Sequence, residues 1–429
     1  MDTRRTLAQV PQLRLVAAVR NSYFLALSRL YYLALRLVYI IALVQIVGVE
    51  RYGYFSYAAN WYVLLMPLAA WGSSELLISQ LALRHRAEQA DYAGTSLTLR
   101  FAFGLLASFV IAVSALWLEE DQQLQMLMLI FSQGVVVRGL LGWYSAMFAA
   151  RGQSARWLRV SVLFTTAEVL CVLLIALSGS SLQSLALAQS GVWWVTLFAV
   201  SRVHFQYFGR ARPRWEASVA RELIRRGAAL GLATFLLFCM VPGLLVVYRY
   251  LQPDLAALGA LALALQVFQI ANQLAMVVSN ALLPALRRPG LGESGNVLSF
   301  IAFSTALCIA AGTTLAWLLA KGVHWLLPLL PSQRFDSALL LLADSGWVGI
   351  PLLALHVLRL ALITLEAVRS YLFAVVCGIL ALGIRLAFAY SGAGVDAPVV
   401  LQSMGVGFGV TAISALACVW VFARPGRLR

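Results

Sequence analysis

The chain has 429 residues, of which 62% are hydrophobic and only 11% are charged. Soluble domains carry charge on about a quarter of their residues, so this composition excludes a soluble globular protein and predicts an all-α polytopic membrane protein. The net charge of +15 comes from 32 basic residues, 31 of which are arginine. Because these arginines border long apolar runs, we expect them to face lipid headgroups, and we expect membrane lipids, not nucleic acid, as partners.

The apolar residues form twelve runs that are separated by short polar segments. A helix needs about 20 mostly apolar residues to cross the hydrocarbon core, so each run predicts one transmembrane helix. The predicted spans are residues 21–47, 53–82, 98–118, 124–150, 158–178, 182–205, 227–250, 255–285, 297–320, 337–361, 370–391 and 398–423.

Basic residues concentrate in every second polar segment. The segments on the side of the N-terminus hold 23 of them, whereas those on the other side hold only Arg51, Lys321 and Arg334. Short cytoplasmic loops of membrane proteins are enriched in arginine and lysine. We therefore predict a multi-pass protein of a bacterial inner membrane with both termini in the cytoplasm.

The longest polar connection on that side, residues 206–226, divides the spans six and six. An offset of 206 residues matches polar and small positions of the two halves, namely Gly53 with Gly259, Asn60 with Gln266, Pro67 with Gln273, and Ser74 with Asn280. These positions recur every seven residues and so share one helix face. The pattern predicts two pseudo-symmetric six-helix bundles, residues 1–210 and 211–429, which is a common plan among transporters.

Three arginines lie well inside the predicted spans of the first bundle, away from their ends. Arg29 and Arg36 are two turns apart on one face of the first span, and Arg138 is near the middle of the fourth. An arginine at the centre of a spanning helix costs at least about 2.5 kcal/mol on insertion, so we look for a role that requires it. Guanidinium groups bind phosphate through several N–H donors, and we interpret the three as an anion-binding site.

A purely structural alternative is that these arginines form ion pairs inside the membrane, as buried ionisable residues usually do. Arg29 would then pair with Glu75, and either Arg36 or Arg138 would pair with Glu168. One cation of the three is left over in this arrangement.

The second bundle has fewer buried charges. Asp344 and Arg385 are expected to form an ion pair in the outer leaflet, with proton or Na⁺ binding by Asp344 as an alternative. Arg249 and Arg359 lie near the ends of their spans and are expected to reach the headgroups.

Amide side chains follow one face of the predicted span 255–285. Hydrogen bonding between helices explains isolated amides of this kind, but a stripe of four also fits the wall of a hydrated cavity that accepts a hydroxyl-rich cargo. The amides in question are Gln266, Gln269, Gln273 and Asn280.

Several motifs of other protein classes are missing from the sequence. There is no GxxxxGK[ST] phosphate loop, and the four histidines show no metal-ligand spacing. We expect no cofactor, no metal and no catalytic activity.

A turn after the first span leads into a second span that contains Pro67, and it carries Gly48, Tyr52, Gly53, Phe55, Tyr57 and Ala58. With this turn and its twelve predicted spans, the chain resembles the O-antigen and polysaccharide flippases of the multidrug/oligosaccharidyl-lipid/polysaccharide exporter superfamily. The resemblance implies that the chain moves a polyprenyl-diphosphate-linked oligosaccharide from the inner to the outer leaflet by alternating access, with the diphosphate on Arg29, Arg36 and Arg138. That lipid-linked glycan is the implied cargo, and other membrane proteins of glycan assembly are candidate partners.

Two other functions stay open at this point. An ion-coupled antiporter of drugs or other cations from the same superfamily would favour buried carboxylates over buried arginines. An integral-membrane enzyme of glycan assembly would place its essential polar residues in a loop outside the membrane.

Overall fold

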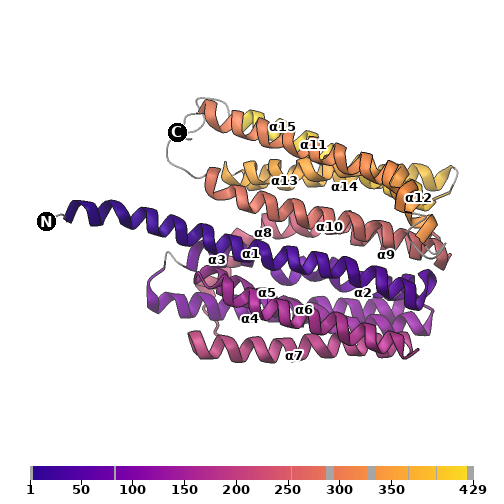
Figure 1. The fold of residues 1–429 in the computed structure, drawn as a ribbon, viewed down its shortest axis with the longest axis horizontal. Helices are drawn as coiled ribbons and strands as arrows, with labels where there is room; N and C mark the ends of the chain where they lie inside the picture. Colours follow the sequence, from indigo (N-terminus) through magenta and orange to yellow (C-terminus); the bar gives the residue numbers. More distant parts are fainter. Residues whose placement is uncertain are drawn as a thin grey trace.

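The computed structural model describes residues 3–81, 84–252, 254–286, 294–326, 335–365, 367–392 and 394–422, and every regular element within these ranges is a helix (Figure 1). The long helices lie side by side along the longest axis of the molecule, so that their ends gather at two ends of one bundle. Helix α1 begins and α15 ends at the same end, which we call the terminal end, and the other is the opposite end. The predicted all-α polytopic membrane fold is confirmed.

Seven helices of the described residues come from the first half of the chain. They are α1 (Thr3–Val47), α2 (Val49–Ala70), α3 (Ser73–Gln80), α4 (Arg86–Leu118), α5 (Gln122–Ala150), α6 (Ser154–Leu177) and α7 (Leu182–Phe208).

Where the structure describes it, the second half contributes eight helices and a short 3-10 turn. They are α8 (Ala217–Cys239), α9 (Pro242–Leu251), α10 (Leu255–Leu286), α11 (Ser294–Leu326), α12 (Asp336–Ser345), the turn η4 (Gly346–Val348), α13 (Gly349–Thr364), α14 (Val368–Ser391) and α15 (Ala397–Phe422).

Local sequence signals set where several helices begin and break. The Asp121 carboxylate accepts hydrogen bonds from the first free N–H groups of α5, and Ser181 does the same for α7. Helix α2 ends at Trp71 and Gly72, which both have left-handed backbone conformations. Helices α8 and α9 are joined at an angle of 45°, and Pro242 occupies the first turn of α9.

Ten helical segments of the described chain are long and apolar enough to cross a membrane, and the bent pair α8 and α9 makes an eleventh. The predicted span 53–82 is the exception, since it is divided into α2 and α3 and does not reach the required apolarity. Helix α2 packs against α4 and α5 of the first half and against α8, α9 and α10 of the second half. Because protein surrounds it, its Asn60 and Ser56 are buried inside the bundle and away from hydrocarbon.

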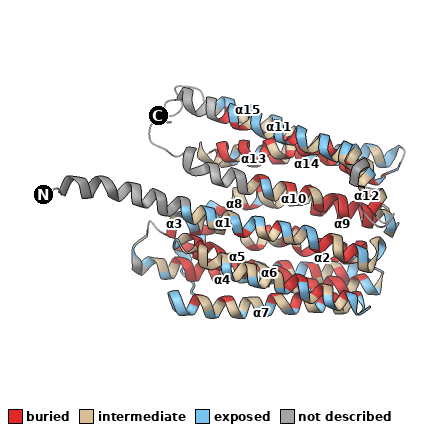
Figure 2. Cartoon of the chain, in the orientation of Figure 1, coloured by how far each residue is buried: buried red, intermediate tan, exposed pale blue. Residues whose placement is uncertain are grey.

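Burial alternates around most of the other helices, with buried faces turned inward and exposed faces outward (Figure 2). The outward faces carry large apolar side chains, such as those of Phe109 on α4, Phe198 on α7 and Phe388 on α14. A soluble protein rarely exposes so much contiguous apolar surface, and in a bilayer this surface is solvated by lipid.

Candidate functional site

Arg138 of α5 is the centre of the polar cluster in the first half. Its Nη1 lies 3.6 Å from Oε2 of Glu168 on α6, and its Nη2 donates a hydrogen bond of 3.2 Å to the Tyr32 hydroxyl on α1. The guanidinium also lies 5.4 Å from the ring of Trp193 on α7, within cation–π distance. Three neighbouring helices therefore hold this cation at a fixed place inside the bundle.

Glu168 is the carboxylate of this cluster, and it is only 8% exposed. Its Oε1 accepts a hydrogen bond of 2.8 Å from Nε2 of Gln189 on α7. Its other oxygen faces Arg138. The structural alternative for Arg138 is therefore correct in part, because this arginine does have a carboxylate partner.

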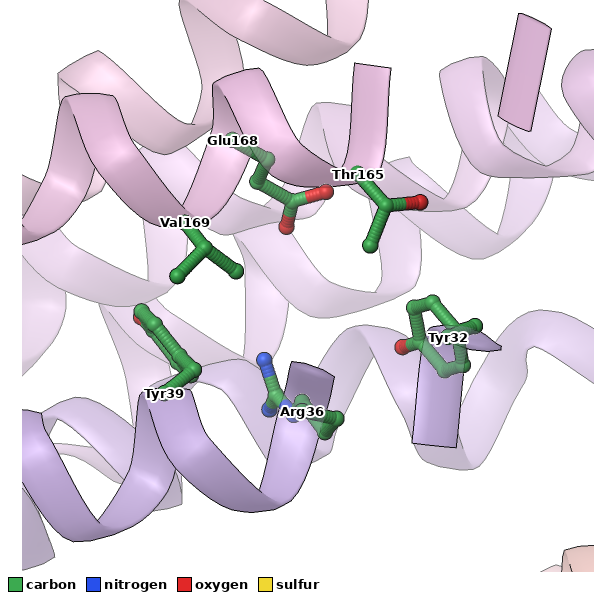
Figure 3. Close-up of a pocket in the computed structure, with 6 residues that line it drawn as sticks. All are labelled: Tyr32, Arg36, Tyr39, Thr165, Glu168 and Val169. Atoms are coloured by element: carbon green, nitrogen blue, oxygen red, sulfur yellow. The ribbon is translucent and has the colours of Figure 1, made fainter. Parts of the chain in front are cut away.

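Arg36 projects from α1 into the space between α1 and α6, where Glu168 projects from the other side (Figure 3). Its guanidinium lies 5.0 Å from the Tyr39 ring, and among the described residues it forms no ion pair with a carboxylate. The pocket between the two helices is lined by Tyr32, Arg36, Tyr39, Thr165, Glu168 and Val169. It has a volume of about 10 Å³, which is room for roughly one water molecule.

Arg29 is exposed, and among the described residues it takes part in no hydrogen bond or ion pair. The charges of Arg138 and Glu75 both act on it, so it belongs to the same electrostatic environment as the other two arginines.

Glu75, which was expected to pair with Arg29, has a different ion-pair partner. Its Oε1 lies 3.8 Å from Nη2 of Arg359 on α13, in the second half of the chain. The predicted pair of Arg29 with Glu75 is wrong, because α3 carries Glu75 to the contact between the two halves. The expectation that Arg359 reaches the headgroups is wrong for the same reason.

Among the described residues, Glu168 is the one carboxylate within ion-pair distance of Arg29, Arg36 or Arg138. In the described part of the chain, Arg29 and Arg36 have no carboxylate within ion-pair distance. Removing a cation such as the half-buried Arg36 from water without a counter-charge is costly. The arrangement is suited to an anion that brings about two negative charges, and it is poorly suited to a cation.

Within the described part of the amide stripe on α10, Gln269 contacts the first half of the chain. Nε2 of Gln269 donates a hydrogen bond of 3.2 Å to Oδ1 of Asn60 on α2, and Gln266 is buried beside it. Gln273 is half-buried. The side chain of Asn280 lies outside the residues that the structure describes.

A neighbouring amide that sequence reasoning did not select is Asn272. Its Oδ1 accepts a hydrogen bond of 2.6 Å from Nε2 of His356 on α13. His356 is buried and lies one turn before Arg359 on the same helix. Neither Asn272 nor His356 belongs to a sequence motif. Only the packing of α10 on α13 shows that these two residues form a pair.

Asp344 and Arg385 do not pair. Arg385 donates a hydrogen bond of 3.0 Å to Oε1 of Gln402, and Asp344 is exposed. The reason lies in the helix arrangement, because α12 packs against α10, α11 and α15 whereas α14 packs against α8, α13 and α15. The predicted ion pair between them is wrong.

Arg249 also lies in an ion pair that the sequence analysis missed. Its Nη2 is 3.2 Å from Oε1 of Glu119, at the junction of α4 and α5. The sequence contains a signal for this pair. Glu119 follows the predicted span 98–118, Arg249 lies near the end of the predicted span 227–250, and these two ends are on the same side of the membrane in the predicted topology. The prediction of headgroup contact for Arg249 is therefore wrong.

Comparisons with known proteins agree with the fold. The sequence matches no family model, and no curated protein matches it by sequence. A transporter of the MOP superfamily from Pyrococcus furiosus, described as having a binding pocket of reversed polarity, is 11% identical with a TM-score of 0.68, and the match covers 95% of this chain and 96% of that one.

Two further solved structures are similar over the same length. One is a multidrug resistance transporter of the MATE family and MOP superfamily in an outward-facing conformation, with 11% identity, coverage of 95% and 96%, and a TM-score of 0.66. The other is a mutant of a MATE transporter from Vibrio cholerae, with 13% identity, coverage of 95% for each chain, and a TM-score of 0.62. Likeness at these identities concerns the fold, and the chain has the fold of MOP superfamily transporters.

Proposed function

We propose that this protein is a flippase that carries a polyprenyl-diphosphate-linked oligosaccharide, such as a repeat unit of O-antigen or another surface polysaccharide, across a bacterial inner membrane. Transport proceeds from the inner to the outer leaflet by alternating access, with no chemical step. The halves 1–210 and 211–429 move against each other, and the terminal end faces the cytoplasm.

The observation that carries this proposal is the excess of guanidinium groups in the first half. Arg138 has one carboxylate neighbour, while Arg29 and Arg36 have none within ion-pair distance among the described residues. A diphosphate linked to a lipid on one side and to a sugar on the other carries two negative charges. It therefore matches the two uncompensated positive charges, and arginine provides planar donors for its oxygens.

The physical need for such a site comes from the bilayer. Each polar group that loses water in hydrocarbon without a new partner costs several kcal/mol, so a sugar diphosphate does not cross unaided. In this proposal the arginines replace the water around the phosphates, and Gln266, Gln269 and Gln273 of α10 form hydrogen bonds with sugar hydroxyls. The small pocket beside Arg36 has room for about one water molecule, so cargo binds after the helices around it separate.

Antiport of a cationic drug is the second candidate, because two of the similar structures are transporters of the MATE family. A cation requires an available carboxylate. Glu168 is the buried acid of this cluster, and it faces Arg138. The charge of the site therefore favours an anionic cargo.

The test is export of surface glycan by cells that carry Arg36→Ala or Arg138→Ala at unchanged protein level. We expect both variants to lose surface glycan and to accumulate the lipid-linked precursor in the cytoplasmic leaflet, and we expect lysine at either position to restore export in part. Arg202→Ala is the matched control, since Arg202 is an exposed arginine of α7 that lies outside the cluster. Wild-type export from both Ala variants contradicts the proposal, and transport of cationic dyes by purified protein supports the antiporter.

A further inference from the structure

Glu168 occupies the position at Arg138 that a phosphate of the cargo would take. This inference rests on the proposed function and concerns the same site. We propose that Glu168 is a built-in competitor of the cargo, which is displaced from Arg138 when the diphosphate binds and returns to Arg138 to expel it. Glu168 is then a positioning residue that sets how tightly the cargo is held.

The geometry of the ion pair suits such an exchange. Nη1 of Arg138 and Oε2 of Glu168 are 3.6 Å apart, whereas a charge-assisted N–H···O hydrogen bond measures about 2.7–2.9 Å. The contact is therefore electrostatic without a close hydrogen bond. A phosphate oxygen that approaches Arg138 to hydrogen-bond distance makes the stronger interaction.

A displaced carboxylate needs another partner, because a buried charge without one is costly. Arg36 lines the same small pocket as Glu168 and lies on its far side (Figure 3). Rotation of the Glu168 side chain toward Arg36 leaves Arg138 and Arg29 for the diphosphate. The three cations, the carboxylate and two phosphate charges then balance.

Among the described residues, Arg138 and Arg36 are the charged groups that the ion pair and the pocket place beside Glu168. Helix α1 contributes Arg36 with the phenols of Tyr32 and Tyr39, and α5 contributes Arg138. Helix α7 contributes the neutral amide of Gln189, which holds Oε1 of Glu168 at 2.8 Å. Gln189 thus binds one carboxylate oxygen, and the other oxygen, which faces Arg138, is the one available for the exchange.

This arrangement answers a problem that every carrier of a multiply charged anion has. Binding must be favourable enough for the cargo to enter and weak enough for it to leave. Three arginines with no carboxylate would hold a diphosphate tightly in both conformations. A carboxylate that competes for one of them lowers the affinity and speeds release.

The experiment compares purified wild type with Glu168→Gln. The probe is a diphosphate diester that carries one farnesyl chain and one N-acetylglucosamine, and its binding is measured by titration calorimetry. We expect Glu168→Gln to bind the probe about tenfold more tightly, while its export of glycan in cells falls because release is slow. Glu168→Asp should restore both values in part, and Glu50→Gln, which changes an exposed carboxylate of α2, should change neither.

The outcomes separate this inference from the proposed function. Failure of wild type and of every variant to bind the probe removes the flippase proposal itself. Binding by wild type with equal or weaker binding by Glu168→Gln overturns only the role of Glu168, provided that thermal unfolding in detergent shows the variant to be folded. A Gln189→Leu variant gives a second measurement, because loss of the hydrogen bond to Glu168 should also alter probe affinity without removing a charge.

Discussion

Gly53 of α2 and Gly259 of α10 are in backbone contact across the two halves of the chain. A Cβ atom built on Gly53 would lie 2.9 Å from the Cα of Gly259, and one built on Gly259 would collide with the backbone oxygen of Val49. These two glycines are also matched by the 206-residue offset between the halves. A residue on a two-fold axis touches its own counterpart, so this contact favours the proposed internal duplication.

We predict that Gly259→Ala weakens this contact. The added methyl group has no space beside Val49, and overpacking of this kind costs about 1–3 kcal/mol. Thermal unfolding of purified protein in detergent should show a lower midpoint. Gly191→Ala on α7 is the control, since no atom lies within 4 Å of its added Cβ and alanine favours a helix by about 0.5–1 kcal/mol. Equal midpoints for the two variants would contradict the prediction.

We predict that Glu119→Gln destabilises the contact between the halves at the opposite end. The Glu119 side chain is 4% exposed and lies 3.2 Å from Arg249, so the substitution leaves a largely buried cation without its counter-charge. Loss of one partner of such a pair costs about 3 kcal/mol. The double exchange of Glu119→Arg with Arg249→Glu should recover part of the lost stability. If it recovers none, the pair does not act as a unit.

The second pair between the halves should behave differently. Glu75 has a side chain that is 55% exposed, and it lies 3.8 Å from Arg359, so solvent screens the interaction. We predict that Glu75→Gln lowers the free energy of unfolding by less than about 1 kcal/mol. Denaturation of Glu75→Gln and Glu119→Gln in the same detergent checks the order. A larger loss for Glu75→Gln would show that burial does not decide the strength of these two pairs.

The sequence predicted the membrane fold because apolar run length is a local property that the bilayer imposes on each helix. It also selected Arg36, Arg138 and Glu168, since a charge inside an apolar run stands out in one dimension. Partner choice could not be predicted in the same way. Glu75 pairs with Arg359 instead of Arg29, and this depends on how α3 and α13 meet. The break at Trp71 and Gly72 ends α2, so that Glu75 lies on the separate helix α3 at that contact. No single residue of the sequence predicts this position.

Arg100 is a second residue whose position could not be predicted from hydropathy. Counting charges between predicted spans assigned it to a loop, because it lies near the start of the predicted span 98–118. Helix α4 instead begins at Arg86, within the polar segment that precedes the predicted span. Arg100 is therefore part of the helix and lies in the interior with an exposure of 3%. Helix propensity extends beyond the apolar run, and hydropathy alone does not detect this extension.

We predict that Arg100→Ala destabilises the protein where α2 ends and α3 begins. The Nη2 of Arg100 donates hydrogen bonds of 2.8 Å and 2.7 Å to the hydroxyls of Ser73 and Ser74, and its Nη1 donates one of 3.2 Å to the carbonyl oxygen of Gly139. A hydrogen bond to a charged group contributes about 1.5–3 kcal/mol, so the loss should reach about 3 kcal/mol or more.

Thermal unfolding measures that loss, and hydrogen exchange locates it, because the amides of α3 should exchange faster when its first turn is no longer held by Arg100. Arg202→Ala on the surface of α7 is the matched arginine control and should leave both measurements unchanged. Since Ser73 and Ser74 accept from the same nitrogen, replacing both by alanine leaves the bond to Gly139 intact and should cost less than Arg100→Ala. Unfolding of Arg100→Ala at the wild-type temperature would mean that the buried guanidinium does not hold α3 in place.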